Sequence, residues 1–383
     1  MYKRLLNIDL PEKQSAFLWG ARKTGKSTFL KMKFPDNVYV DLLLSDNYMK
    51  YLNAPQRLRE ELNAVDTKIL NSPIIIDEVQ KIPQLLDEIH WLIENKGLNF
   101  ILSGSSARKL KRGKANLLGG RAWRFTMLPL TSKEIGEFNL LDVLNKGLIP
   151  SHYLSSNYKK SLKAYIHDYL KEEVFDEGLT RNIPAFSRFF DSIGYSLGEL
   201  TNYANIAREC GVNEKTVKEY YQILIDTLLG TLVEPFKKRQ ERQVIQKAGK
   251  FYLFDVGVAG AISKRNIIEE KGELFGKAFE HFIFMEINAF KLYNDFDFEI
   301  NFWRTKSGEE VDFILNSGEI AIEVKGSSNI GNQHLKGLIK FKELHNTKKT
   351  ILVCNEKTPR ITRDIEILPV RIFLEKLWNR EIV

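Results

Sequence analysis

The feature that most constrains this chain lies near its start, where an apolar run leads into a glycine-rich loop. The run SAFLWG (15–20) predicts a strand, and the segment after the loop predicts a helix. The loop satisfies all four fixed positions of the GxxxxGK[ST] pattern in the strand–loop–helix setting that the pattern requires. Such loops bind phosphate through inward-pointing N–H groups and a helix N-terminus. The residues expected to bind ATP are Gly20, Ala21, Arg22, Lys23, Thr24, Gly25, Lys26, Ser27 and Thr28.

Two of these loop residues have further expected roles. Lys26 would reach the β- and γ-phosphates and take part in catalysis, and the Ser27 hydroxyl would bind Mg²⁺. The alternative is a glycine-rich turn with an incidental lysine and serine, and the complete pattern argues against it. We therefore expect ATP and Mg²⁺ as cofactors.

A second apolar run, PIIIDE (73–78), ends in two carboxylates. Its unbroken apolar character is typical of a buried parallel strand, and ligands bind at the carboxyl ends of such strands. We expect Asp77 to hold the Mg²⁺ ion through its waters and Glu78 to orient the attacking water. The alternative is a strand that ends in solvent with two surface acids.

The next two strands carry weaker signals. The run NFILSG (99–104) reaches Ser103, and Ser105 follows, so that two hydroxyls could contact the γ-phosphate; turn-forming serines are an equal alternative. Arg121 follows two glycines just before the strand WRFTMLPL (123–130). An arginine at such a corner could act as a catalytic arginine finger on the nucleotide of a neighbouring subunit, which would require a homo-oligomer. It could equally cap the preceding helix.

At this point the sequence resembles a known family. The segments GARKTGKS, IIIDEVQK, FILSGSSARKL, GGRA and MLPLTSKEI match, in order, the AAA-type ATPases of bacteria and archaea that carry a C-terminal domain of unknown function. The later segments FYLFDVGVAGAI, GKAFEHFIFMEI and VDFIL…IEVKGS also resemble that family. The resemblance implies an ATPase core with a helical lid, a winged-helix segment and a restriction-endonuclease-like end.

The pattern along the chain supports this organisation. Short apolar runs alternate with amphipathic stretches over residues 15–130, which predicts a three-layer α/β domain around a parallel sheet. The expected fold class is α/β: an AAA-type ATPase core with a phosphate loop, a helical lid, a winged helix-turn-helix and a nuclease-like α/β domain. The corresponding boundaries are 1–131, 132–184, 185–248 and 249–383.

Composition excludes several classes of protein. The hydrophobic fraction of 43% and the charged fraction of 28% are those of a globular protein rather than a disordered one. Two cysteines favour a reduced, cytoplasmic setting over a disulfide framework. No run of 18 uncharged apolar residues occurs, so no membrane is expected as a partner. The formal net charge of +8 is a mild indication of a phosphate-rich partner.

The middle of the chain predicts a helix-turn-helix. Residues 202–209 and 213–224 have helical spacing, Gly211 suits the turn, and Asn213 suits the cap of the second helix. The basic stretch 237–250 that follows resembles the wing of a winged helix, which contacts phosphates. The alternative is a winged helix used only for packing or partner binding. The residues expected to contact nucleic acid, and DNA in particular, are Lys215, Thr216, Lys218, Lys237, Lys238 and Arg239.

Near the C-terminus, two strands flank the hairpin signal Asn316-Ser317-Gly318. If Ser317-Gly318 is a two-residue turn, the numbers of paired residues sum to 635, which places Asp312 opposite Glu323. Opposed carboxylates destabilise a pair of strands, so a cation should compensate them. Lys325 lies on the same face as Glu323, and Glu280 in the helical stretch 276–292 is a candidate third carboxylate.

This arrangement resembles the PD-(D/E)xK nuclease core, with Val311 in place of the usual proline before Asp312. The resemblance implies that Glu280, Asp312, Glu323 and Lys325 form a nuclease site with a second Mg²⁺ or Mn²⁺ ion. The alternative is a salt-bridge cluster in a domain that binds without cutting. Two functions therefore stay open: an ATPase coupled to DNA binding and cleavage, or an ATP-gated regulatory or binding protein with an inactive nuclease-like domain.

Overall fold

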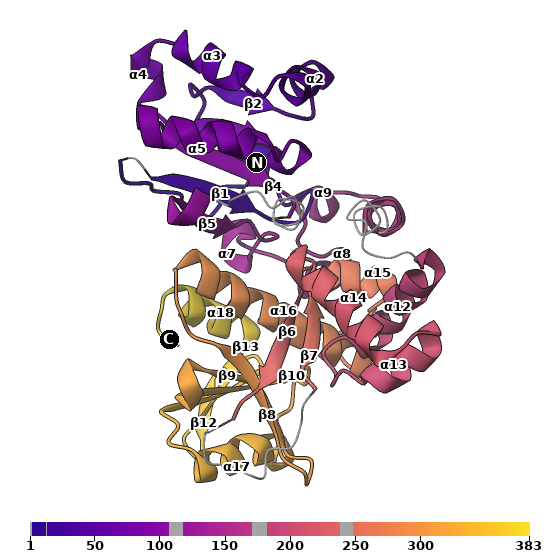
Figure 1. The fold of residues 1–383 in the computed structure, drawn as a ribbon. Helices are drawn as coiled ribbons and strands as arrows, with labels where there is room; N and C mark the ends of the chain where they lie inside the picture. The colour runs from indigo at the N-terminus through magenta and orange to yellow at the C-terminus, as the bar shows by residue number, and fades with distance from the viewer. Residues whose placement is uncertain (1, 13, 107–117, 171–181, 238–247) are drawn as a thin grey trace. The chain divides into compact units, whose positions relative to one another are not determined.

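The computed structural model of the chain describes residues 2–12, 14–106, 118–170, 182–237 and 248–383. Contacts between Cα atoms divide it into two units (Figure 1). The N-terminal unit comprises Arg4–Leu128 together with Asp226–Leu229, and the C-terminal unit comprises Met1–Lys3, Pro129–Ile225 and Gly230–Val383. Of the expected DNA contacts, Lys238 and Arg239 lie outside the described residues.

The N-terminal unit is built on a parallel sheet in the order β2-β3-β4-β1-β5. Its elements are β1 (Ser15–Trp19), α1 (Lys26–Lys33), β2 (Tyr39–Asp41), α2 (Ser45–Asn53), α3 (Arg57–Asn63), α4 (Thr67–Leu70), β3 (Ile74–Asp77), η1 (Val79–Lys81), α5 (Leu85–Lys96), β4 (Phe100–Gly104), η2 (Leu118–Gly120) and β5 (Ala122–Thr126). The predicted α/β fold with a parallel sheet is confirmed. Two separate helices, α3 and α4, fill the stretch before β3, because the Asp66 side chain accepts a hydrogen bond from Lys68 N and so starts α4.

One face of this sheet buries alternate strand residues against α2, α3 and α5. Phe17, Ile76 and Leu102 lie in one apolar cluster with helix residues that include Leu58 and Ile89. Side chains alternate between the two faces of a strand, so the residues between them point to the other face. This apolar core fixes the ends of the strands and, with them, the polar side chains that follow.

The C-terminal unit begins with a helical segment and continues into a mixed sheet. Its first elements are α7 (Ser132–Ile135), α8 (Leu140–Lys146), α9 (Pro150–Tyr153), α10 (Tyr158–Ala164), the π-helix η3 (Tyr165–Leu170), α12 (Ile183–Ser196), α13 (Tyr203–Cys210) and α14 (Glu214–Asp226). The segment expected to form a lid packs within this unit, because α7 contacts α18 and α8 contacts α15 and α16. Its role as a lid stays a prediction.

The mixed sheet has the order β12-β13-β11-β10-β9-β8-β6-β7. Its elements are β6 (Gly230–Pro235), β7 (Lys250–Leu253), α15 (Val256–Ile262), α16 (Glu273–Tyr293), β8 (Ile300–Arg304), β9 (Glu310–Leu315), η4 (Asn316–Gly318), β10 (Ile320–Lys325), η5 (Asn332–Leu335), α17 (Lys336–Leu344), β11 (Lys349–Cys354), β12 (Arg360–Thr362), β13 (Ile365–Pro369) and α18 (Val370–Trp378). β6 pairs antiparallel with β7 and parallel with β8. Through β6, the strand that follows α14 is joined to the strands near the C-terminus.

The hairpin register predicted for β9 and β10 is confirmed. Ile320 pairs with Leu315 and Ile322 pairs with Phe313, and both pairs of numbers sum to 635. The connection differs in detail, because residues Asn316–Gly318 form a 3₁₀ turn with Asn316 and Ser317 at positive φ, rather than a two-residue turn. The register nevertheless brings the two candidate acids of these strands together.

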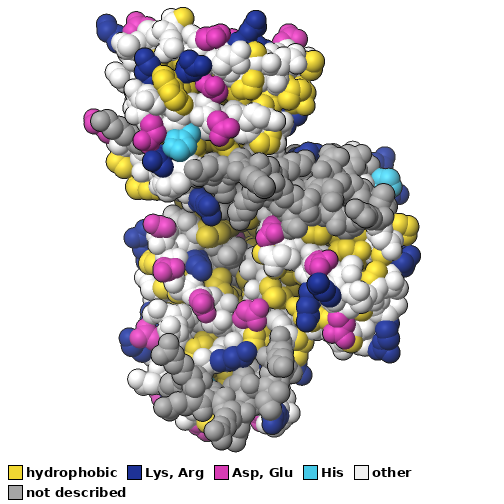
Figure 2. All heavy atoms as spheres, viewed as in Figure 1, with side chains coloured by type: hydrophobic (Ala, Val, Ile, Leu, Met, Phe, Trp, Pro, Cys, Tyr) yellow, Lys and Arg dark blue, Asp and Glu magenta, His cyan; other side chains and the backbone are white. Residues whose placement is uncertain are grey.

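Charged side chains of both signs are interspersed on the face seen in Figure 2. The positive net charge is therefore not gathered into one basic stripe on that face. Within the described part of the chain, no helix has both the length and the apolar composition needed to span a bilayer.

Candidate functional site

The phosphate loop connects the end of β1 to the start of α1. Gly25 adopts φ 97°, a left-handed conformation that favours glycine, and α1 begins at the next residue. A Cβ atom on Gly20 would lie 2.3 Å from the carbonyl oxygen of Met127, so the first loop position is closed to larger residues. Both glycines of the pattern are therefore required by the backbone itself.

Lys26 is buried at the centre of this loop, with 5% of its surface exposed. Its ammonium donates to the carbonyl oxygens of Gly20 at 2.7 Å and Ala21 at 3.2 Å. Thr24 Oγ1 also donates to Ala21 O, at 2.8 Å. The loop thus holds a positive charge against neutral acceptors, at the place where the pattern expects an anionic phosphate.

The two residues expected to bind Mg²⁺ share a neighbour that the sequence did not indicate. The Tyr39 hydroxyl, from β2, donates to Asp77 Oδ2 at 2.5 Å and is also hydrogen-bonded to Ser27. Burial and then the Asp77 carboxylate raise the pKa of Tyr39, so this hydroxyl keeps its proton. Ser103, the last serine of β4, donates to Asp77 Oδ1. A carboxylate and a hydroxyl brought together at strand ends form a set of hard oxygen donors that fits Mg²⁺.

Glu78 follows Asp77 in a left-handed conformation, with φ 61°. Burial raises the pKa of the Glu78 carboxyl above its ordinary value, and the positive charge of Lys26 acts in the opposite direction. Gln80 donates through Nε2 to Glu78 Oε2 and to Ser105 Oγ, the latter at 3.2 Å. The structure therefore places Glu78 near Lys26, and Ser105 holds Glu78 indirectly, through a glutamine that no motif signalled.

Arg121 lies elsewhere on the sheet. β5 runs parallel to β1, with Ala122 level with Ser15, whereas the phosphate loop follows Trp19 at the other end of β1. The Arg121 side chain forms an ion pair with Glu94 that is partly exposed to solvent. Within one chain, Arg121 thus lies at the opposite end of the parallel strands from the phosphate loop. Its action on a neighbouring subunit stays a prediction.

A second group of charged residues lines a cavity of about 480 Å³ in the C-terminal unit. All four predicted nuclease-site residues reach this cavity, from α16, β9 and β10. Its lining residues are Leu197, Gly198, Glu199, Leu200, Lys250, Lys277, Glu280, Arg304, Glu310, Asp312, Glu323 and Lys325. The convergence of Glu280, Asp312, Glu323 and Lys325 follows from the strand register and from the position of α16 beside β10.

The most buried cation of this cavity is Lys250, at the start of β7, with 3% of its surface exposed. Its ammonium lies 2.6 Å from Glu310 Oε1, 3.2 Å from Glu280 Oε1 and 3.4 Å from Asp312 Oδ1. Burial lowers the pKa of Lys250, but Glu280 and the other neighbours outweigh it and hold that pKa well above its ordinary value. Lys250 belongs to the basic stretch 237–250 that the sequence predicts to contact phosphates, and the structure corrects this prediction for Lys250, which is a buried charge.

Other contacts hold the carboxylates of the cluster, and one oxygen has no hydrogen-bond partner. Tyr252 donates to Glu280 Oε1 at 2.5 Å, and Val324 N donates to Asp312 Oδ2 at 2.9 Å. Lys325 forms an ion pair with Glu323 Oε1, whereas Glu323 Oε2 is buried with no hydrogen-bond partner. Burial, followed by the Asp312 carboxylate, raises the pKa of Glu323 well above its ordinary value.

As they stand, these residues do not fit a divalent metal ion. Among the residues described, no group of three or more carboxylate, histidine or cysteine side chains has the geometry of a metal site. The physical reason is Lys250, whose ammonium contacts two of the predicted metal ligands, Glu280 and Asp312, and also Glu310. The motifs of the sequence do not indicate this contact, because Lys250 is 30 residues from Glu280 and 62 residues from Asp312 along the chain.

The predicted helix-turn-helix has the expected local structure. Gly211 ends α13 with φ 67°, and Asn213 Oδ1 accepts a hydrogen bond from Thr216 N at 2.8 Å at the start of α14. Lys215 and Lys218 are exposed, and the Lys218 ammonium lies 5.2 Å from the centre of the Tyr203 ring. Lys237, just after β6, is exposed as well.

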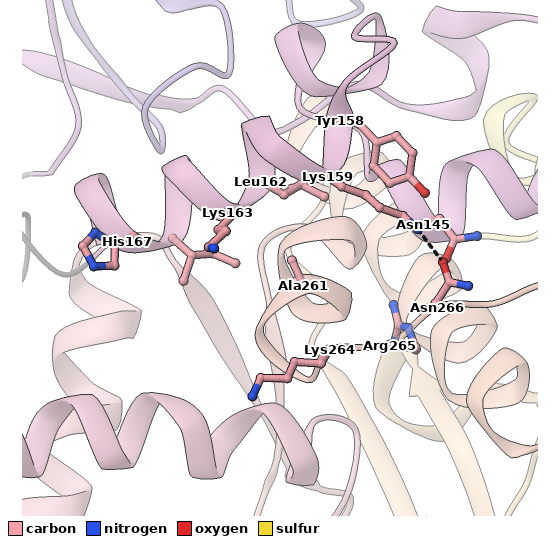
Figure 3. Close-up of a pocket in the computed structure, with 11 residues that line it drawn as sticks. Asn145, Tyr158, Lys159, Leu162, Lys163, His167, Ala261, Lys264, Arg265 and Asn266 are labelled. Atoms are coloured by element: carbon pink, nitrogen blue, oxygen red, sulfur yellow. Dashed lines mark hydrogen bonds between the residues drawn. The ribbon is translucent and has the colours of Figure 1, made fainter.

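A further cavity of about 480 Å³ lies between α10, η3 and α15 (Figure 3). Lys159, Lys163, Lys264 and Arg265 are among its lining residues. Arg265 donates through Nη2 to the Val256 carbonyl at 2.9 Å, and burial lowers its pKa to about 10. None of the predicted site residues lines this cavity.

Comparison with known proteins assigns families to both units. Residues 12–136 match the family described as AAA domain. The N-terminal unit is therefore similar to this AAA family. Residues 137–267 and 275–373 match two domains of unknown function, DUF8612 and DUF4143. The resemblance to AAA-type ATPases with a C-terminal domain of unknown function is confirmed, and an AAA domain of this kind indicates ATP binding and hydrolysis.

Similar proteins are found in bacteria and archaea. An uncharacterized protein of Mycobacterium tuberculosis is 25% identical over 297 residues, covering 72% of this chain and 66% of the relative. Another from Methanocaldococcus jannaschii is 24% identical over 243 residues, covering 58% and 52%. A Walker-type ATPase of Pyrococcus abyssi has a similar structure, with a TM-score of 0.41, 14% identity and coverage of 65% and 90%. The chain spans about two thirds of the length of its mycobacterial relative.

Proposed function

We propose that this protein is a Mg²⁺-dependent ATPase whose hydrolysis cycle controls nucleic-acid binding by the C-terminal unit. The observation that carries the first part is the buried ammonium of Lys26, held by the carbonyl oxygens of Gly20 and Ala21. These carbonyl groups orient the lysine, and the Glu78 carboxylate is close enough to interact with its charge. A phosphate that enters the loop would be attracted by this buried ammonium.

The neighbouring residues divide the chemistry between them. Ser27 and Asp77 would hold Mg²⁺, which neutralises negative charge on the phosphates when it is bound. Glu78, kept in place by Gln80, would orient the attacking water and accept its proton. Because burial raises the pKa of Glu78, this carboxylate is a better proton acceptor than an exposed glutamate.

The second part of the proposal concerns DNA. It is supported by the succession α13, turn, α14 and the antiparallel pair β6–β7, which is the order of elements in a winged helix. Lys215 and Lys218 are exposed on α14, where a recognition helix carries its DNA contacts. Thr216 serves partly as a capping partner, since its hydroxyl is hydrogen-bonded to Asn213.

The test is ATP hydrolysis measured with the full chain and with Lys26→Ala. We expect hydrolysis to fall by about three orders of magnitude in the variant, because phosphate-loop charges act on the transition state. DNA binding measured with and without ATP, in the wild type and in Lys215→Ala/Lys218→Ala, tests the coupling. Equal hydrolysis by Lys26→Ala would contradict the ATPase, and equal DNA binding in every arm would contradict the coupling.

The proposal allows two candidates for the C-terminal unit. One cuts the DNA that it binds, and the second binds DNA without cutting it. Lys250 favours this candidate, because its ammonium lies among the carboxylates of the predicted nuclease site. The two candidates differ in one experiment: cleavage of linear, circular and single-stranded DNA with Mg²⁺ or Mn²⁺, with and without ATP. Cleavage lost in Lys325→Ala would establish a nuclease, whereas no cleavage beside intact ATP hydrolysis would support the binding protein.

A further inference from the structure

The carboxylate cavity contains its own cation. The Lys250 ammonium contacts one oxygen each of Glu280, Glu310 and Asp312, at 2.6 to 3.4 Å. A divalent metal ion needs the same oxygens at about 2.0 to 2.6 Å. Two cations that share these oxygens would be only a few ångströms apart in a buried site, where like charges repel strongly.

The charged side chains that line the cavity show how much negative charge Lys250 balances. Five carboxylates and four basic side chains line it, so the formal sum is −1. Without Lys250 the sum would be −2, which a single divalent cation would balance. Glu323 Oε2, buried without a partner, would then provide an additional oxygen ligand.

The backbone fixes the lysine in this position. Lys250 pairs with Val233 of β6 on one side and forms a bridge with Leu200 on the other. The preceding carbonyl, Gly249 O, accepts hydrogen bonds from Thr201 N and Thr201 Oγ1, both at 2.9 Å. Tyr252, two residues along the same face of β7, donates to Glu280. The backbone of Lys250 therefore cannot leave the cluster without breaking strand pairing, whereas its side chain can.

We propose that Lys250 is the resident cation of this cavity and excludes divalent metal ions from it. Asp312, Glu280 and Glu323 accept a divalent ion only when the Lys250 side chain is removed or displaced. The inference rests on the proposed function in that it concerns the regulation of the same nuclease-like site.

The experiment measures Mn²⁺ binding to the nucleotide-free full chain, by the electron paramagnetic resonance signal of unbound Mn²⁺. Lys250→Met removes the charge at similar length, and Lys250→Arg is the matched control that retains it. We expect Lys250→Met to bind one more Mn²⁺ ion per chain than the wild type, at least about tenfold more tightly than any wild-type binding at this cavity. Lys250→Arg should behave as the wild type, and Lys250→Met/Asp312→Asn should lose the added ion.

Two results would overturn the proposal. One is a folded Lys250→Met protein that gains no Mn²⁺ ion. The other is a wild-type protein that loses a bound Mn²⁺ ion on Asp312→Asn alone, and this comparison decides the matter even if Lys250→Met does not fold. Neither DNA nor ATP is present, so failure of the proposed ATPase or DNA binding would leave this result unchanged.

Discussion

Two lysines of this protein are almost equally buried but have opposite surroundings. Lys26 is 5% exposed and donates to backbone carbonyls of its own loop. Lys250 is 3% exposed and lies among three carboxylates that come from α16 and β9. The hydrogen bonds of Lys26 go to neutral carbonyl groups, with the Glu78 carboxylate nearby, whereas Lys250 is surrounded by carboxylates that belong to the fold.

The difference shows how the partner of a buried charge decides what that charge can do. A lysine held by neutral acceptors attracts an external anion, and its removal affects function more than folding. A lysine held by carboxylates stabilises the fold, and its removal leaves buried negative charges without a counterion. The burial of a lysine therefore does not by itself indicate which of these two roles it has.

The largest expected effect concerns the stability of the C-terminal unit. Lys250→Met should lower its free energy of unfolding by about 3 to 5 kcal/mol at pH 8, because it breaks a buried ion cluster. Lys26→Met should cost the N-terminal unit less, about 1 kcal/mol, since the hydrogen bonds that it removes go to carbonyl groups. Urea unfolding of both variants measures this, and equal losses would remove the distinction between the two lysines.

Glu286 extends the comparison to a buried carboxylate held by neutral donors. Ser132 N and Trp378 Nε1 each donate to it at 2.7 Å, and Ser132 Oγ donates at 2.8 Å. Burial raises its pKa to about 7, so the folded state binds more protons than the unfolded state between about pH 4.5 and 7. Stability should therefore fall as the pH rises through that window, by about 3 kcal/mol for this group.

The variant Glu286→Gln tests this pH dependence, because glutamine does not titrate. Its free energy of unfolding, measured from pH 5 to pH 8, should show a smaller decline than that of the wild type. Glu280 and Asp255 have raised pKa values in both proteins, so the difference between the two curves isolates Glu286. Parallel curves would contradict the prediction.

The next prediction concerns ATP hydrolysis and Glu78, which lies near Lys26. Glu78→Gln should slow ATP hydrolysis about a hundredfold while leaving nucleotide binding intact, since glutamine can orient water but cannot accept its proton. In the wild type, hydrolysis should decline as the pH falls, starting above the ordinary glutamate pKa, because burial raises the pKa of Glu78. A pH–rate profile and binding of a fluorescent nucleotide check both statements; unchanged hydrolysis would exclude Glu78 as the base.

The smallest effect on stability is expected for the partly exposed ion pair between Arg121 and Glu94. The side chains of Arg121 and Glu94 are 39% and 46% exposed, so Arg121→Ala should change stability by no more than about 0.5 kcal/mol. If Arg121 acts on a neighbouring subunit, hydrolysis per chain should nevertheless rise with concentration in the wild type and not in the variant. Identical hydrolysis at every concentration would exclude that role.

The phosphate loop and the β9–β10 register could be predicted because their information is local. Gly20 to Ser27 is one continuous motif, and the pairing of Leu315 with Ile320 is fixed by a short turn and by alternating apolar residues. Asp77 could be placed because the ends of neighbouring parallel strands share an edge.

The residues that complete these sites could not be predicted, because pairing between strands that are distant in the sequence brings them into place. Lys250 reaches Asp312 only because β6 pairs with β7 on one side and with β8 on the other. Tyr39 reaches Ser27 and Asp77 through the position of β2 at the sheet edge. Neither residue belongs to a motif, and a lysine in a basic stretch suggests a surface position rather than a buried one.

The short segment Asp226–Leu229 belongs to the N-terminal unit although the chain on both sides of it belongs to the C-terminal unit. Ser106 Oγ, two residues after β4, donates to the Asp226 carbonyl at 3.4 Å, and Leu228 packs against the apolar cluster of the AAA domain. A fragment ending at Leu128 would therefore lack part of its own core, and no single cut separates the units. The same segment is continuous with α14 on one side and with β6 on the other, so the two elements flanking the wing region enter and leave through a segment that belongs to the N-terminal unit.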